Sequence, residues 1–299
     1  MGMSHIKTIL VLLFILFTSI GFCSAKLVFN GTPAAENAYL CTFAIQKNIS
    51  RKMEIRGAKE PPQQILRTDF TLTGKLEIRE NSPRGLLFQF TVDSFQWFEN
   101  GVQNTAVQFR RAKIQTGIDN WGTLRVCRLE DDALSTARVI PPSLKDALLE
   151  LGRSLRTDAA GFLGENTEKA PGAHWLADDR LIQTIVKYRN LSGFQQKDWD
   201  SKVLYYGQEK YFDSAVDRVD LNLFTNSIPG YVCRLDILYR FPGVKADTNP
   251  PLDYRFNMFE SVDKVMPENN PLFSGTKFTE FLTLSVRRSL IPVKQPENK

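Results

Sequence analysis

Long runs of alternating apolar and polar residues are the feature of this sequence that most limits its fold. In DFTLTGKLEIRE, the residues Phe70, Leu72, Gly74, Leu76 and Ile78 alternate with polar residues. Successive side chains of a strand point to opposite faces, so this run predicts a long strand with one face in water. The same alternation returns in YVCRLDILYRF, DYRFNMFESV and KFTEFLTLSVRR.

The segment GLLFQFTVDSFQWFENG interrupts this alternation once. Phe90 and Val92 share one face, whereas the next apolar residues, Phe95 and Trp97, follow the opposite register. A shift of one residue turns every later side chain to the other face of a sheet. We therefore expect a β-bulge or a sharp bend near Asp93–Ser94, which would help a long sheet to curl.

One helix is predicted near the middle of the chain, in PPSLKDALLELGRSL. Its leucines form one apolar stripe, and Ser143 is the expected N-cap. Weaker strand patterns occur at Tyr39–Ile45, Val107–Ile114, Leu124–Leu129, Ile182–Tyr188, Val203–Tyr206 and Val219–Phe224.

Together these elements predict a mainly β (α+β) fold. We expect a long antiparallel meander curved into a half-barrel or barrel-like sheet, with a mid-chain helix. A closed barrel, a sandwich or a half-barrel around the helix would each cover the apolar face. The predicted organisation is a signal peptide at 1–25, a first β-meander at 26–140, a helix and loop at 141–176, a second β-meander at 177–291 in one domain with the first, and a flexible tail at 292–299.

The N-terminal segment has the pattern of a secretory signal peptide. ILVLLFILFTSIGF carries no charge, and Cys23 and Ala25 are the small residues of a cleavage site. The run is short for a membrane span, so we expect an exported protein, periplasmic or secreted, with no transmembrane span after cleavage. A lipid anchor on Cys23 is the less favoured alternative, because the preceding residue, Phe22, is large.

The sequence contains none of the common catalytic motifs. GxSxG, the P-loop, HExxH and GxGxxG are absent, and His174 is the only histidine after the signal peptide. We therefore expect no enzyme activity, no cofactor and no metal. The acidic runs Glu130–Asp132 and Asp178–Asp179 fit solvated turns. A hydrolase built from carboxylates distant in sequence is the alternative.

The charge of the chain bears on whether it binds nucleic acid, and its cysteines bear on metal sites and disulfides. The net charge of +5 is mild and no basic stripe with interleaved aromatic residues occurs, so no nucleic-acid partner is expected. Cys41, Cys127 and Cys233 have no metal-site spacing. They fit buried free thiols, although one disulfide would be permitted in an exported protein.

The signal peptide, the long alternating strands and the mid-chain helix together resemble bacterial lipoprotein carriers and related periplasmic lipid-handling proteins, the LolA-like group. The layout is also similar to uncharacterised exported bacterial proteins. This resemblance covers most of the exported chain but includes no specific motif, so it transfers no site residue. It implies a half-barrel with an apolar concave surface that holds acyl chains.

Ten strand residues are the candidates for lining such a surface, although strands bury residues of these types in ordinary cores as well. They are Phe88, Phe90, Val92, Tyr231, Leu235, Ile237, Tyr254, Phe256, Met258 and Phe278. The predicted function is an exported non-enzymatic protein that binds a lipid or another apolar ligand on a curved β-sheet. The alternative is an envelope or cell-surface structural or protein-interaction module with a solid core, whose partner is an envelope protein.

Overall fold

The computed structural model describes residues 38–55, 58–59, 61–82, 84–103, 109–119, 122–130, 139–155, 170–188, 196–242, 250–265 and 276–293. The predicted signal peptide with Cys23, most of the loop predicted after the helix, and most of the predicted tail lie outside these residues. The strands are β1 (Ala38–Ile55), β2 (Ala58–Lys59), β3 (Gln63–Ser82), β4 (Gly85–Glu99), β5 (Val102–Gln103), β6 (Lys113–Asp119), β7 (Leu124–Glu130), β8 (His174–Trp175), β9 (Asp200–Tyr211), β10 (Ser214–Thr225), β11 (Tyr231–Pro242), β12 (Asp253–Val265) and β13 (Lys277–Pro292). The helices are α2 (Pro142–Leu155), α4 (Asp179–Tyr188) and a 3₁₀ turn at Gln196–Asp198.

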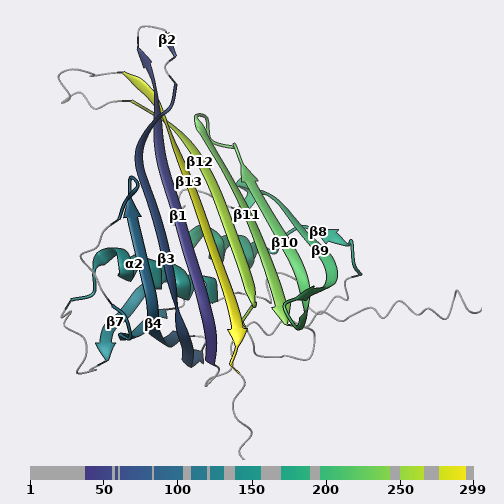
Figure 1. The fold of residues 1–299 in the computed structure, drawn as a ribbon. Helices are drawn as coiled ribbons and strands as arrows, with labels where there is room; N and C mark the ends of the chain where they lie inside the picture. Colours follow the sequence, from purple (N-terminus) through teal and green to yellow (C-terminus); the bar gives the residue numbers. More distant parts are fainter. Residues whose placement is uncertain are drawn as a thin grey trace, which may run out of the picture.

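All the described strands belong to one antiparallel sheet, which Figure 1 shows as a broad, twisted layer. The order across it is β7-β6-β4-β3-β1-β13-β12-β11-β10-β9-β8, with β2 beside β1 and β5 beside β4. The two ends of this path, β7 and β8, are not paired with each other, so the sheet is open. The predicted mainly β meander with a mid-chain helix is confirmed.

The first and the last described strands, β1 and β13, lie side by side in the middle of the sheet. β1 pairs with β3 on one side and with β13 on the other, from Tyr39 opposite Pro292 to Met53 opposite Phe278. The first half of the chain therefore fills one side of the sheet and the second half fills the other. The connection between them carries α2, which lies across one face of the sheet (Figure 1). We call this the inner face.

The inner face and α2 pack against each other closely. Leu144, Leu148 and Leu151 are completely buried, which confirms the predicted apolar stripe. A Cβ on Gly152 would lie 3.1 Å from the side chains of both Phe88 and Ile118, so a glycine here lets the helix approach β4 and β6. The core of this half of the sheet therefore depends on direct helix–sheet contact.

The start of the helix differs from the prediction by one residue. The helix begins at Pro142, so Ser143 lies inside its first turn and is not the N-cap. Proline is favoured at the first helical position, because the N–H that it lacks would have no partner inside the helix. The carbonyl of Pro141 accepts from the N–H groups of Leu144 and Lys145, at 3.1 and 3.0 Å.

The bulge predicted in β4 is present. Thr73 of β3 lies opposite Ser94, but the next residue, Gly74, lies opposite Val92, which leaves Asp93 as the extra residue. A Cβ on Gly74 would be 2.0 Å from the carbonyl oxygen of Thr91, so no larger residue fits at this step. The bulge keeps apolar residues on the inner face of both parts of the strand.

Two of the weaker strand predictions are wrong. The segment 182–188 belongs to α4, where Ile182, Ile185 and Val186 are buried at the spacing of one helical face. Their β-branched side chains favour a strand locally, but packing decided otherwise. Of the strand expected at 107–114, residues 107–108 lie outside the described residues and Phe109–Ala112 forms a turn, in which the Ala112 N–H donates to the Phe109 carbonyl at 3.0 Å; the strand described there starts at Lys113.

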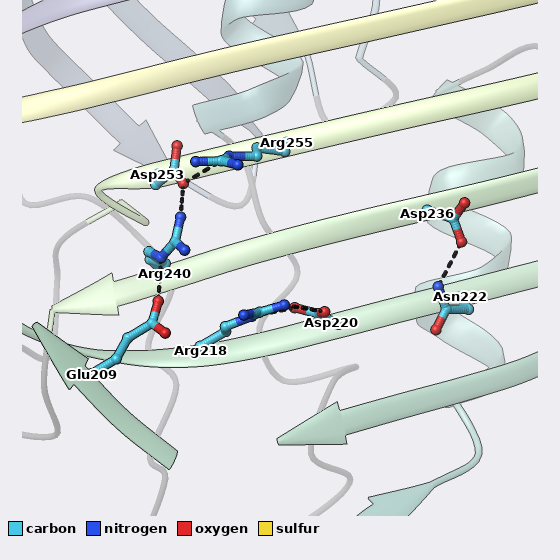
Figure 2. Close-up of polar contacts among 8 residues, drawn as sticks. All are labelled: Glu209, Arg218, Asp220, Asn222, Asp236, Arg240, Asp253 and Arg255. Carbon is cyan, nitrogen blue, oxygen red and sulfur yellow. Dashed lines mark hydrogen bonds and ion pairs between the residues drawn. The ribbon is translucent and has the colours of Figure 1, made fainter. Parts of the chain in front are cut away.

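The outer face carries ion pairs that run across the strands (Figure 2). Arg240 of β11 pairs with Glu209 of β9 and with Asp253 of β12. The Nε of Arg255 lies 3.2 Å from Oδ2 of Asp253. Exposed pairs contribute only about 0–1 kcal/mol each, but the Arg240–Asp253 pair is largely buried, since the two side chains are 14% and 6% exposed. These charges make this part of the outer face polar, whereas the buried apolar residues of β9 to β12 lie on the inner face.

Candidate functional site

A groove lies beside α2, where the helix leaves part of the inner face uncovered. It encloses about 610 Å³ and is bordered by β1, β3, β4, β12, β13 and α2. Pockets for small molecules span roughly 300–1,000 Å³ and are mostly apolar with a few polar groups. The groove therefore has the size of a ligand site.

The floor of the groove is apolar because cross-strand pairing aligns inner-face residues. Phe70 lies opposite Ile45 of β1 and opposite Trp97 of β4. On the other side of β1, Leu284 of β13 lies opposite Met258 of β12. Directly opposed residues share a face of the sheet, so these side chains form one surface from β4 to β12.

Of the ten residues predicted to line a ligand surface, Met258 lies in this groove. Phe278 borders a separate hollow of about 480 Å³ at the ends of β1, β12 and β13, and Tyr231 is half-buried beside the core. The other seven, Phe88, Phe90, Val92, Leu235, Ile237, Tyr254 and Phe256, are buried in the packed core.

Lys47 is the groove residue that stands out chemically. It is half-buried on the inner face of β1, opposite Thr68 on one side and Leu284 on the other. Within the described part of the chain, no ion pair or hydrogen bond engages its ammonium group. Sequence reasoning could have found it, because Lys47 is the only charge in the inner register from Tyr39 to Ile49.

The remaining charges of the groove lie on its rim. Glu99 at the end of β4 and Asp146 of α2 are exposed, and neither has a partner among the described residues. Arg153 is already engaged, since it pairs with Glu150 at 2.6 Å and its Nε donates to the carbonyl of Gly122 at 3.1 Å. Lys47, Glu99 and Asp146 are thus the groove charges that have no partner among the described residues.

Two groove residues also have buried hydrogen-bonding atoms that are not used within the described residues. These atoms are the hydroxyl oxygen of Ser143 and the indole Nε1 of Trp97. Buried polar atoms are nearly always hydrogen-bonded in proteins, so an unused one calls for an explanation. Both can act as donors toward an acceptor in the groove.

The thiols are poor candidates for chemistry. Cys41, Cys127 and Cys233 are all free, and burial raises the pKa of both Cys41 and Cys233 to about 12. A thiol must lose its proton to act as a nucleophile, so both are inert near neutral pH.

The described residues include no cluster of three His, Cys, Asp or Glu side chains that could hold a metal. His174 is exposed on β8, a two-residue strand where a loop was expected.

The fully buried Arg288 serves to attach α2 to the sheet. Its Nη1 donates to the carbonyl of Ser154 at 2.7 Å, and its Nη2 donates to the carbonyl of Pro251 at 2.6 Å. Ser154 is in the last turn of α2, where the carbonyls form the negative end of the helix dipole. Burial lowers the pKa of Arg288 to about 10. Arg288 therefore helps to hold the helix that borders the groove.

Comparisons with known proteins place the chain in no family. No family model and no curated protein matches it. A chain from a structure titled "Lipid-protein interactions in lipovitellin" is similar at 9% identity and a TM-score of 0.33 over 89% of this chain, which spans 26% of that one. An outer membrane channel from Pseudomonas putida F1 is similar at 8% identity and a TM-score of 0.18, and the alignment covers 89% of this chain and all of the channel. The outer membrane protein OprG from Pseudomonas aeruginosa is similar at 11% identity and a TM-score of 0.15, with the same coverage of both chains.

The resemblance to the LolA-like group stays a prediction, because no family model and no curated protein matches the chain. None of the described helices is long and apolar enough to cross a membrane.

Proposed function

We propose that this protein is an exported, non-enzymatic binding protein that holds a lipid or another apolar ligand in the groove between α2 and the inner face. The observation that carries the proposal is an apolar floor that the described residues leave partly uncovered, beside a core that is otherwise closely packed. Phe88 and Phe90 on the same face are completely buried, whereas Trp97, Leu282 and Leu284 are only partly covered.

An apolar floor open to water favours occupation by a ligand. Each Å² of apolar surface removed from water contributes about 25 cal/mol. An acyl chain lying along Trp97, Leu282 and Leu284 would bury apolar surface of both partners. No covalent chemistry is needed for this role.

The alternative of a protein-interaction module is favoured by a different surface. Phe224 and Phe259 on the outer face are 37% and 39% exposed, and both lie opposite Arg234 of β11. The ring of Phe281 lies 6.3 Å from that of Phe259. An envelope protein could dock on these aromatic residues. Repeated recovery of one partner by the wild-type protein, but not by a Phe259→Ser variant, would support this function.

Fluorescence quenching tests the proposed groove directly. Adding dibromostearic acid to delipidated protein should quench Trp97, because the bromine atoms would lie beside the indole. A Trp97→Phe variant should lose most of the quenching. Trp199, which is buried outside the groove residues, provides the control variant Trp199→Phe, and this variant should keep the quenching. Saturable quenching that survives in Trp97→Phe would place the fatty acid elsewhere and overturn the proposal.

Intact-mass analysis tests the export part of the proposal. We expect cleavage after Ala25, which leaves Lys26 at the N-terminus. A mass that includes diacylglycerol on Cys23 would replace this assignment with a lipid anchor.

A further inference from the structure

The three groove charges that no described residue pairs with differ in exposure. Lys47 is half-buried among Ile45 and Leu284, at the level of the apolar floor, whereas Glu99 and Asp146 are exposed on the rim. Glu99 lies in the same cross-strand row as Lys47, because Thr68 is opposite both of them. The stem of the cation therefore lies against the apolar surface, and the two carboxylates are the more exposed charges of the groove.

The stem of Lys47 packs among apolar side chains while its ammonium group still reaches solvent, as in other long amphipathic side chains, and no described residue pairs with it. A ligand anion beside Lys47 would give this cation a counter-ion next to the apolar floor. The N-terminus of α2 also favours an anion, because it is the positive end of the helix dipole. Ser143 lies there, and its buried hydroxyl makes no hydrogen bond to a described residue.

The rim carboxylates point to a second, opposite charge on the ligand. A ligand with only a negative charge would be attracted by Lys47 but repelled by Glu99 and Asp146. A ligand with only a positive charge would be attracted by the two carboxylates but repelled by Lys47. Arg153 does not compensate for these carboxylates, because it is paired with Glu150.

We infer that the groove selects a zwitterionic amphiphile, with a phosphate next to its apolar chain and an ammonium group at its outer end. This inference rests on the proposed function, because the apolar chain must occupy the groove floor. The phosphate then lies against Lys47 and the hydroxyl of Ser143, and the ammonium group lies against Glu99 and Asp146. Phosphoethanolamine and phosphocholine amphiphiles have this order of charges.

Four detergents with the same twelve-carbon chain test the inference by isothermal titration below their micelle concentrations. Dodecylphosphocholine is zwitterionic, dodecyl phosphate is anionic, dodecyltrimethylammonium is cationic and dodecyl maltoside is uncharged. We expect dodecylphosphocholine to bind about tenfold more tightly than each of the others, equivalent to about 1.4 kcal/mol.

Two variants assign the charges. Lys47→Met keeps the length of the side chain and should weaken dodecylphosphocholine about tenfold while leaving dodecyl maltoside unchanged. The double variant Glu99→Gln with Asp146→Asn should weaken dodecylphosphocholine and strengthen dodecyl phosphate. Lys202→Met, an exposed lysine on the outer face of β9, is the matched control and should change nothing.

The outcomes separate this inference from the proposed function. If all four detergents bind equally, the charges select nothing and the inference fails while the apolar groove stands. If dodecyl phosphate binds most tightly, the site is an anion site and the inference also fails. If none of the four binds, the proposed function fails as well.

Discussion

Two leucine-to-alanine substitutions on the same face of the sheet should differ sharply in their effect on stability. Leu72 of β3 is completely buried, opposite Phe43 on one side and Phe95 on the other. Leu284 of β13 is on the same face but borders the groove and is only partly covered. Because the substitution is the same, the difference reports how well each site is packed.

The expected magnitudes follow from burial. Leu72→Ala leaves a cavity that neighbouring side chains cannot fill, so it should lower the free energy of unfolding by about 3–5 kcal/mol. Leu284→Ala enlarges a space that already exists, and part of its side chain is in water, so the loss should be about 1 kcal/mol. The first loss is a large fraction of the roughly 5–15 kcal/mol that stabilises an ordinary domain.

Urea unfolding of delipidated protein, followed by circular dichroism, measures both values, and equal m-values would show that the unfolded states are comparable. Thr283→Ala, exposed on the outer face beside Leu284, is the control and should change stability by less than about 0.5 kcal/mol. If Leu284→Ala costs as much as Leu72→Ala, the groove is filled by protein in solution. If Thr283→Ala is equally severe, the assignment of the two faces is wrong.

Three further predictions concern buried polar groups. Burial raises the pKa of Asp217, so its ionised form favours the unfolded chain, and the stability associated with protonated Asp217 is lost as pH rises through the folded-state pKa. Asp217→Asn should therefore gain stability relative to wild type in urea titrations as the pH rises from the ordinary aspartate range through the raised pKa of Asp217; an unchanged difference would contradict this. Arg288→Met leaves two buried carbonyls without donors and should cost about 2–5 kcal/mol in thermal or urea unfolding, whereas exposed Arg287→Met should cost little; equal losses would refute the role of Arg288. Ellman's reagent at pH 8 should label half-buried Cys127 before Cys41, whose pKa of about 12 keeps it protonated; fast labelling of Cys41 in the native protein would show that this part of the core opens.

Local patterns predicted the elements whose cause is local. The alternation in β3, the apolar stripe of α2 and the bulge at Asp93 each depend on residues within a few positions of one another. The failure at 182–188 has the opposite origin. Ile182, Ile185 and Val186 fit both a strand by type and a helix by spacing, and burial of one face selected the helix.

The groove was harder to predict than the sheet. Aromatic content directed attention to Phe88, Phe90 and Phe256, which lie in the packed core. Residue type shows that a side chain belongs on the inner face, but it does not show whether another element covers that side chain. Lys47 carried the better signal, a charge within an apolar register, because such an exception is rare in a core.

The sequence by itself determined the long strands, their two unlike faces, the bulge in β4 and the mid-chain helix, because these follow from side-chain periodicity along the chain. Only the tertiary structure decided that β1 and β13, from opposite ends of the chain, lie side by side at the centre of the sheet. It also decided where α2 lies on the inner face, and hence which apolar residues stay uncovered around Lys47. Those outcomes depend on packing between segments far apart in the sequence, which no local pattern encodes.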